Sequence, residues 1–129
     1  KVLWLSKPQF QLIDAKALEK IFINEAARFF AEHVPKWANL MRESCAAIEV
    51  KSYKSRWGCC RHDRRVQFNW KLLQAPNSVV EYVIVHELCH LKEMNHSAKF
   101  WQLVKTFQPD YRVSKKYLRE NGAAMLAII

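Results

Sequence analysis

The feature that most constrains the fold of this chain is a helix that has no polar face. Asn77 and Ser78 follow Pro76 as a helix-start signal, and the segment from there to about Met94 is apolar on nearly every side. A helix of this composition has to be buried. Asn95, which suits a left-handed C-terminal turn, is where we expect the helix to end. The sequence therefore predicts a central helix that the rest of the chain covers.

This buried helix carries three residues that are out of place in a hydrophobic core. In the run His86-Glu87-Leu88-Cys89-His90, the two histidines are four positions apart and share one helix face. Two imidazoles on one face can bind a single ion, and Glu87 then flanks the bound water and can take its proton. We therefore predict one Zn2+ per chain, with Glu87 as general base. The alternative is a pair of hydrogen-bonded core histidines without a metal.

A catalytic zinc site needs a third protein ligand and leaves its fourth position to water. His96 is the predicted ligand. It lies six residues past His90, so the helix has to end near Asn95 for its ring to return to the other two. Glu93 shares the face of His86 but lies farther along the helix axis, which makes it a supporting or surface residue. Two carboxylates are remoter candidates: Asp110 and Glu120.

Two segments have the alternating pattern of β-strands. In Ala47–Tyr53 and in Arg64–Trp70, apolar side chains tend to occupy every second position. The segment 58–63 between them supplies a turn. We therefore predict an antiparallel hairpin with an irregular connection.

Helical periodicity is found on both sides of these strands. The segment Asp14–His33 has a helical pattern with its first residue placed to cap it, and Pro35 is predicted to stop this helix and start another. After the central helix, Ser97 can cap a third helix. A last helix is predicted to start near Ser114 and to weaken at Asn121-Gly122. Together these elements predict an α+β fold in one domain that spans residues 1–129.

Composition limits the cellular compartment and the binding partners that are expected for the chain. Half of the 129 residues are apolar, so a core can form, and no apolar run is long enough to cross a membrane. The four cysteines lack C-x-x-C spacing and no signal peptide is seen, so we expect a reducing, cytoplasmic setting. The net charge of +9 suggests an anionic partner such as nucleic acid, because basic and aromatic residues are interleaved over Lys51–Trp70. A well-solvated surface explains the charge equally well.

Four separated segments gain a further meaning when they are taken together. They are Lys54–Cys60 (KSRWGCC), Val66–Leu72 (VQFNWKL), Glu81–Leu91 (EYVIVHELCHL) and Asn95–Trp101 (NHSAKFW). In this order they resemble the YgjP-like metallopeptidase family, a group of small zincins related to the SprT-like and WLM zincins. The likeness covers about residues 35–120.

The resemblance implies a minimal zincin fold, in which a short antiparallel sheet packs on the active-site helix and a following helix brings the third ligand. The zinc ligands matched by position are His86, His90 and His96. The matched catalytic glutamate is Glu87. The residues matched as cleft-shaping or substrate-binding are Arg56, Trp57 and Asn69.

This chain departs from the family pattern at two places. Where the family has Trp-Gly-Ser-Cys, the chain has Trp57-Gly58-Cys59-Cys60, so a hydroxyl has become a thiol. Family members generally carry strands before the first helix, whereas little precedes Leu12 here. Either the chain is shortened at its N-terminus, where it also lacks an initiator Met, or it is a minimal member.

The sequence leaves three functions open. The first is zinc-dependent peptide hydrolysis, in which metal-activated water attacks a peptide bond and the strand Val66–Trp70 offers an edge to an extended substrate. The second, which the resemblance also implies, is release of pyrophosphate from a nucleoside triphosphate such as UTP. The third is a nucleic-acid-binding module that uses the basic patch Lys51–Arg65 beside a structural zinc. We favour the first, and a structural zinc would have no use for Glu87.

Two properties are not set by the sequence. The oligomeric state is one of them. The other is the group that stabilises the transition state, for which four side chains are chemically able: Arg56, Tyr82, Tyr111 and Tyr117.

Overall fold

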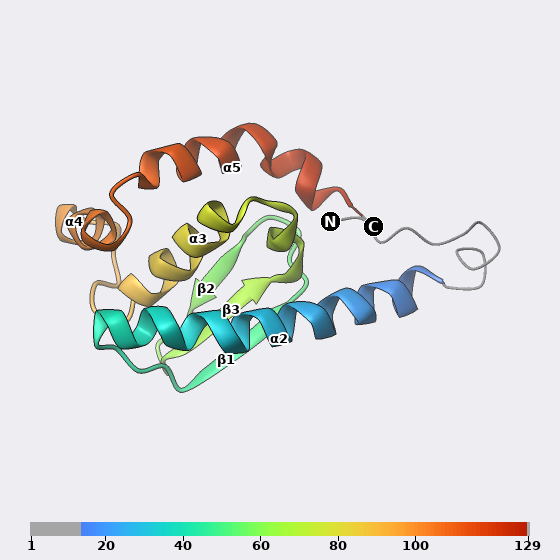
Figure 1. Cartoon of the computed structure of the whole chain (residues 1–129), viewed down its shortest axis with the longest axis horizontal. Coiled ribbons are helices and arrows are strands. Elements are labelled where there is room, and N and C mark those ends of the chain that lie inside the picture. Colours follow the sequence, from blue (N-terminus) through green and yellow to red (C-terminus); the bar gives the residue numbers. More distant parts are fainter. Residues whose placement is uncertain (1–13, 129) are drawn as a thin grey trace.

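The computed structural model describes residues 14–128 of the chain. Within this range lie four α-helices, one short 3-10 helix and three strands (Figure 1). In chain order the elements are α2 (Ala15–Met41), β1 (Ala47–Lys51), β2 (Gly58–Cys60), β3 (Arg65–Asn69), η1 (Trp70–Gln74), α3 (Asn77–Cys89), α4 (Ala98–Phe107) and α5 (Tyr111–Leu126). This content confirms the predicted α+β class.

The three strands form one mixed sheet in the order β1-β3-β2. β1 runs parallel to β3, with Ala47 opposite Arg65, and β2 runs antiparallel to β3, with Gly58 opposite Phe68. The predicted antiparallel hairpin between the segments at 47–53 and 64–70 is therefore wrong, because the segment assigned to its turn contains β2. The chain leaves β1, crosses to the far side of β3 and returns through β2, which provides the long connection that parallel strands require.

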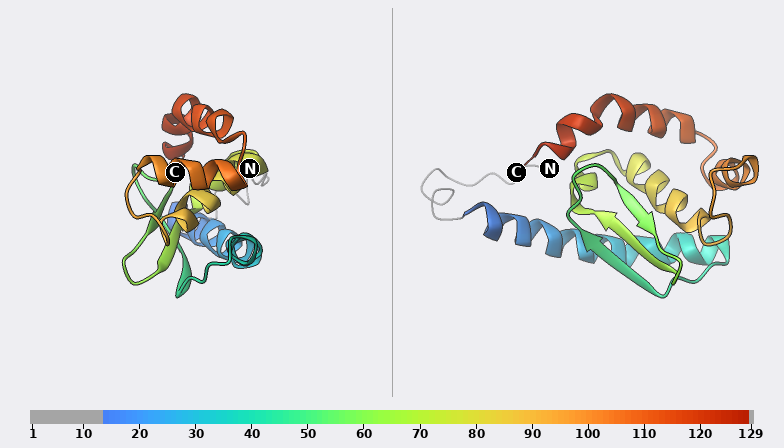
Figure 2. Two further views of the ribbon diagram at one scale, coloured as in Figure 1. Left: turned by 90° about the vertical axis from the view of Figure 1, so that its left-hand side faces the viewer. Right: turned by 180° about the vertical axis from the view of Figure 1, so that it is seen from behind.

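One face of the sheet is covered by two helices, with α2 over β1 and α3 over β2 (Figure 2). Phe30 of α2 stacks on Phe68 of β3, with the ring centroids 4.6 Å apart, and both residues are fully buried. α3 lies between α2 and α5 and is buried along most of its length, as its sequence predicts (Figure 1). Removal of these apolar surfaces from water is the main force that holds the layers together.

α2 is longer than the sequence predicts, because it continues through Pro35 to Met41. A proline inside a helix removes a backbone hydrogen bond and costs about 3 kcal/mol. Here the buried stripe of the helix extends past the proline, so tertiary packing outweighs that cost. The stripe consists of Ala26, Phe30, Val34, Ala38 and Met41. Asp14 caps the helix start, as predicted, by accepting a hydrogen bond from the Ala17 amide (2.7 Å).

The central helix is shorter than predicted. α3 ends at Cys89 rather than near Met94, and the chain then turns before α4. Asn95 does not provide the left-handed turn expected of it. In the part of the chain that the structure describes, the non-glycine residues with positive φ are Arg42 and Arg64.

α4 and α5 complete the fold. Ser97 caps α4, as predicted, by accepting a hydrogen bond from a backbone amide of the first turn (3.4 Å). α5 begins at Tyr111, before the predicted Ser114, and runs unbroken through residues 121–122, where packing outweighs the low helix propensity of glycine. Within residues 14–128, no helix is long and apolar enough to cross a membrane.

Candidate metal centre

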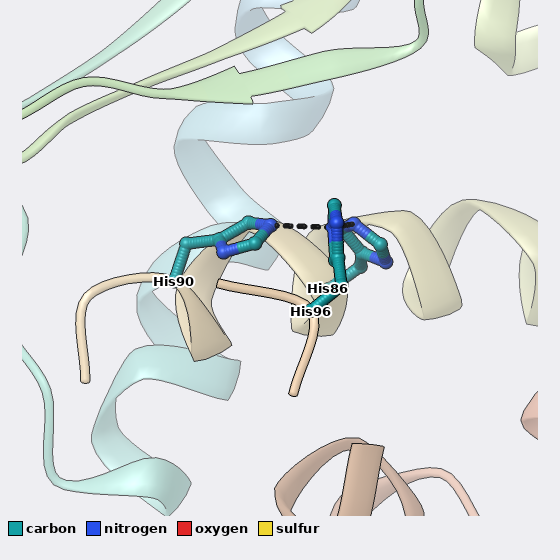
Figure 3. A group of neighbouring side chains, drawn as sticks. All are labelled: His86, His90 and His96. Carbon is teal, nitrogen blue, oxygen red and sulfur yellow. Dashed lines mark hydrogen bonds between the residues drawn. The ribbon is translucent and has the colours of Figure 1, made fainter. Parts of the chain in front are cut away.

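Three histidine rings meet at the C-terminal end of α3 (Figure 3). His86 lies in the last turn of α3, His90 follows its last residue, and His96 lies in the loop just before α4. The Nε2 atom of His96 is 3.0 Å from that of His90 and 3.3 Å from that of His86. The structure thus brings together the three residues that the sequence singled out as ligands.

The geometry of this cluster fits a zinc ion. At a Zn–N distance of about 2.0–2.1 Å and tetrahedral angles, two ligand nitrogens lie roughly 3.3 Å apart, close to the separations found here. The Nδ1 atom of His90 is 3.0 Å from the Glu93 carbonyl, and because a carbonyl only accepts, the proton is on Nδ1 and the Nε2 lone pair faces the cluster. Nδ1 of His86 lies 3.4 Å from the Tyr82 hydroxyl, which can hold that ring in the same way. Three imidazoles leave a fourth position for water.

Burial keeps the imidazoles of His86 and His90 neutral, which is the form that binds metal. Burial lowers the pKa of His86 to about 3 and also lowers the pKa of His90. Phe100 of α4 stacks on His90 with ring centroids 4.4 Å apart, and it packs edge-on against His86 at 5.0 Å. This aromatic packing fixes the ring orientations that a metal site requires.

Glu87 lies beside the histidines and is buried, with 6% of its surface exposed. Burial raises the pKa of its carboxyl group to about 8, and the charge of the nearby Arg56 opposes this shift. The same side chain lines the cleft that contains the three imidazoles. Glu87 is therefore shielded from bulk water while it borders the same cleft as the three histidines.

Gly58 of β2 makes room for this carboxylate. A Cβ atom at position 58 would lie 2.8 Å from Cγ of Glu87 and 3.1 Å from the carbonyl oxygen of Gln67. A side chain there would force the strand or the carboxylate to move. The sequence placed Gly58 in a predicted turn and in a segment that carries the family resemblance, and neither predicted its contact with Glu87. Its place as one of two glycines in the chain, inside an extended segment, is the signal of a close approach that could have identified it.

A cleft of about 270 Å³ opens over the histidines, with β2 along one side. It is lined by Arg56, Gly58, Cys59, Cys60, His86, Glu87, His90, Met94 and His96. β2 is an edge strand, whereas β3 is the central strand of the sheet. The prediction that the strand at 66–70 offers a free edge is therefore wrong, because both sides of β3 are already paired.

The three residues predicted to shape the cleft or bind substrate lie at different depths. Asn69 is fully buried, and its side-chain amide donates to the carbonyls of Tyr53 (3.1 Å) and Arg56 (3.0 Å). These bonds fix the segment that leads into β2. Trp57 packs its ring against Gly122 of α5. Arg56 is the member of the three that lines the cleft over the histidines.

The four candidates for transition-state stabilisation are now separated by position. Arg56 lines the histidine cleft. Tyr82 is buried with its hydroxyl at the Nδ1 side of His86, on the opposite side of the ring from the cluster. Tyr111 is buried in the core and Tyr117 is partly buried against it. Of the four, Arg56 is therefore the residue that lines the same cleft as the three histidines.

The alternative metal ligands stay outside the cluster. Glu93 contributes through its backbone carbonyl, which accepts from His90, and its side chain is not among the grouped ligand atoms. Asp110 immediately precedes α5, and Glu120 is exposed on that helix. Among the described residues, the three histidines form the group whose ligand atoms lie within 4.8 Å of one another.

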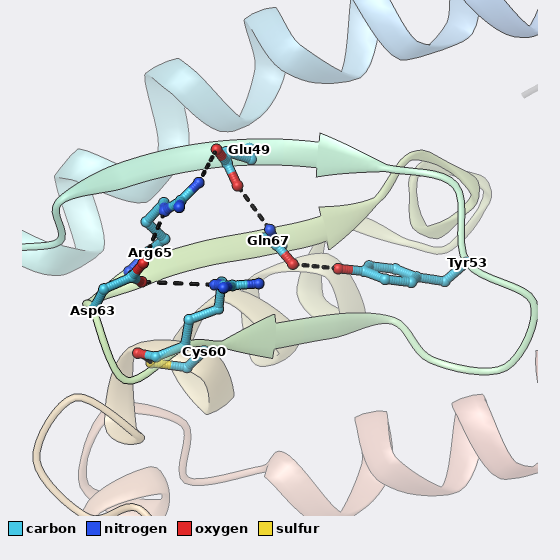
Figure 4. Close-up of polar contacts among 7 residues, drawn as sticks. Glu49, Tyr53, Cys60, Asp63, Arg65 and Gln67 are labelled. Carbon is cyan, nitrogen blue, oxygen red and sulfur yellow. Dashed lines mark hydrogen bonds and ion pairs between the residues drawn. The ribbon is translucent and has the colours of Figure 1, made fainter.

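A chain of hydrogen bonds holds the strands in place on the outer face of the sheet (Figure 4). The Tyr53 hydroxyl donates to the side-chain carbonyl of Gln67 (2.5 Å), whose amide donates to Glu49 (2.7 Å). Hydrogen bonds from Gln67 and Arg65 lower the pKa of the Glu49 carboxyl. The chain links β1, β3 and the segment that leads into β2.

Several cations of the basic run at 51–65 form ion pairs or hydrogen bonds with neighbouring residues. Arg65 pairs with Glu49 (3.2 Å) and with Asp63 (3.0 Å) (Figure 4). Arg64 is held by a carboxylate and a carbonyl next to the end of α2. Arg61 also pairs with Asp63 (3.8 Å), whereas Lys51, Lys54 and Arg56 form no ion pair within residues 14–128. Contact between this surface and nucleic acid stays a prediction.

The comparison with protein families agrees with the site. The model of the family described as "YgjP-like, metallopeptidase domain" matches residues 6–121, which is more than half of the chain. No curated protein and no solved structure matches the chain. The matched range contains the three histidines, Glu87 and every residue that lines the cleft.

The two glycines form a matched pair that tests how closely β2 packs on Glu87. Gly58→Ala pushes a methyl group into Glu87, so we expect the free energy of unfolding to fall by about 1–3 kcal/mol. Gly122→Ala meets the Trp57 ring at an ordinary 3.5 Å, and alanine favours a helix by roughly 0.5–1 kcal/mol, so this variant should be at least as stable as the wild type. Urea unfolding measures both. A Gly58→Ala protein with wild-type stability would contradict the close approach.

Proposed function

The chain belongs to the YgjP-like metallopeptidase family, and we propose that it is a zinc-dependent peptidase. The observation that carries the proposal is the convergence of three imidazoles and a buried carboxylate on one cleft. A structural zinc site is closed by four protein ligands and needs no base. Three nitrogen ligands with Glu87 beside them are the arrangement of a hydrolytic site.

His86, His90 and His96 would hold the zinc ion through their Nε2 atoms. Bound there, zinc supplies a Lewis acid that acidifies water and polarises a carbonyl group. The chain's own contribution is to keep the His86 and His90 rings neutral by burial and to orient them through their Nδ1 atoms. The Glu93 carbonyl does this for His90, and the Tyr82 hydroxyl is placed to do it for His86.

Glu87 is the proposed general base. Its carboxylate lines the cleft between β2 and the histidines, so it can take a proton from the attacking water and return it to the leaving nitrogen. Burial raises its pKa to about 8, and a pKa near the working pH suits a group that both accepts and returns a proton. Gly58 allows this carboxylate to reach the cleft between the strand and the helix.

The free edge of β2 supports a peptide as the substrate. Trp57 and Arg61, which flank β2, each make a backbone hydrogen bond to β3 or its end. Bonded residues alternate in an antiparallel pair, so the backbone groups of Gly58 and Cys60 point away from β3. An extended peptide can pair with these groups along the cleft.

The lining of the cleft also favours a peptide over a nucleotide. A nucleoside triphosphate carries several negative charges and is held by several cations or by a metal with a cation. Of the described residues that line the cleft, Arg56 is the one lysine or arginine. Release of pyrophosphate from UTP therefore stays a prediction of the family resemblance, and we rank peptide hydrolysis first.

Replacing Glu87 by glutamine tests the proposed base. Glutamine keeps the size of the side chain but cannot take up a proton, so kcat/KM for a quenched-fluorescent peptide should fall by roughly 10²–10⁴-fold. Zinc content, measured by elemental analysis on the same sample, should stay at that of the wild type. Glu93→Gln is the matched control, because its side chain lies outside the histidine cluster. Loss of zinc together with activity would show that Glu87 holds the metal, and full activity would refute its role.

Arg56 is the proposed partner of the negative charge that develops on the substrate carbonyl. Arg56→Ala should lower kcat by roughly 10²-fold, which is the usual effect of removing one such donor. Arg56→Lys should recover part of the loss, since it keeps the positive charge. Lys54→Ala removes an exposed charge that does not line the cleft and should leave kcat unchanged. An Arg56→Ala protein with wild-type kcat would assign the role to another group.

A further inference from the structure

A second, smaller hollow adjoins the cleft. It has a volume of about 190 Å³ and shares Gly58, His86 and Glu87 with the cleft over the histidines. Its other walls come from three separate segments and are mostly apolar. They are Trp57, Tyr82, Val83 and Leu118. Neither the ligands nor the proposed base require this hollow, although it borders both.

These walls are held in place independently of any substrate. Tyr82 and Val83 belong to the buried part of α3, with 4% and 3% of their surfaces exposed. The Trp57 ring lies against Gly122 of α5, where a Cβ atom would be 3.5 Å from it. Leu118 contributes from the same helix. The hollow is therefore a preformed feature, as binding pockets for small groups usually are.

The size and the lining of the hollow indicate what it accepts. A volume of 190 Å³ equals the share of roughly six water molecules in the liquid, at about 30 Å³ each, which is room for a branched aliphatic or a phenyl group. Glu87 is the acidic residue at its border, and none of the described residues that line it is a lysine or an arginine. An acidic side chain would lose its hydration there without gaining a partner, so an apolar group fits best.

We propose that this hollow receives an apolar side chain of the substrate, on the residue next to the scissile bond. The inference rests on the proposed peptidase function and names its substrate class, which is peptides with leucine, methionine or phenylalanine beside the bond that is cut. A peptide backbone paired with β2 passes Gly58, which borders both hollows. One side chain can then enter the apolar hollow while the carbonyl group stays over the histidines. Trp57 and Leu118 set the size limit.

Two hydroxamic acids distinguish binding in the apolar hollow from binding at the metal centre. Acetohydroxamic acid and 4-methylpentanohydroxamic acid chelate zinc through the same group, and the second carries an additional isobutyl group. Isothermal titration calorimetry with the zinc-loaded protein should show at least tenfold tighter binding of the longer compound, since one methylene in an apolar pocket is worth roughly 10–200-fold. Equal affinity of the wild type for the two compounds, or binding of neither, would overturn the proposal.

Substitutions in α5 test whether the hollow causes the tighter binding of the longer hydroxamic acid. Leu118→Trp fills it and should bring the ratio of the two affinities close to one, with binding of acetohydroxamic acid unchanged. Val113→Trp adds the same ring to the outer side of the helix, where the residue is 70% exposed, and should keep the wild-type ratio. Leu118→Ala enlarges the hollow and should favour a phenyl-bearing hydroxamate, which covers the case in which Leu118→Trp does not fold. A wild-type ratio in every folded Leu118 variant would overturn the proposal.

Peptide cleavage distinguishes this inference from the proposed function. A peptide library randomised on both sides of the cut should show a preference for leucine, methionine or phenylalanine next to the bond, and Leu118→Trp should lose it. Cleavage without that preference would overturn the proposed role of the hollow but would still support the peptidase function. Hydroxamate discrimination with no peptide cleaved would overturn the peptidase and keep the hollow as an apolar binding site for another substrate.

Discussion

The early end of α3 is the constraint on which the site depends. If the helix continued past Cys89, positions 90 and 96 would lie roughly 120° apart around its axis, and their rings would face different sides. Because α3 stops and Ser97 starts α4, the loop between them turns His96 back to within 3.0 Å of His90. Phe100, in the first turn of α4, then packs on both rings. The cluster is thus a product of where one helix ends and the next begins.

Burial of α3 gives the cluster its chemistry. Moving imidazoles and a carboxyl group out of water favours their neutral forms, so the same cause shifts their pKa values in opposite directions. The pKa of His86 falls to about 3, which leaves a lone pair for a metal, and the pKa of Glu87 rises to about 8, which suits a group that accepts a proton and gives it back. Gly58 keeps that carboxyl accessible from one side. His86 and Glu87 are therefore both shielded from bulk water and in contact with the cleft, within one turn of the helix.

Features that depend on near neighbours in the chain could be read from the sequence, whereas pairing across the chain could not. The four-residue spacing of His86 and His90 fixes a common helix face, and Ser97 caps a helix through a group three residues away, so both were predictable. Whether β1 runs parallel or antiparallel to β3 depends on the strand β2 that lies between them in the chain. β2 has three residues, which are too few to show an alternating pattern in the sequence. Continuation of α2 through Pro35 depends on packing against the sheet, which local propensity does not contain. The roles of the site residues in zinc binding and catalysis stay proposals, because they concern a bound ion and a substrate.

X-ray absorption at the zinc edge, on protein loaded with one equivalent of Zn2+, tests the three-histidine site most directly. We predict three imidazole nitrogens at about 2.0–2.1 Å and an oxygen from water as the fourth ligand. Cys59 and Cys60 line the same cleft, and ligation by either thiolate would add a sulfur neighbour at about 2.3 Å. A sulfur shell, or fewer than three imidazoles around the ion, would contradict a hydrolytic centre built on His86, His90 and His96.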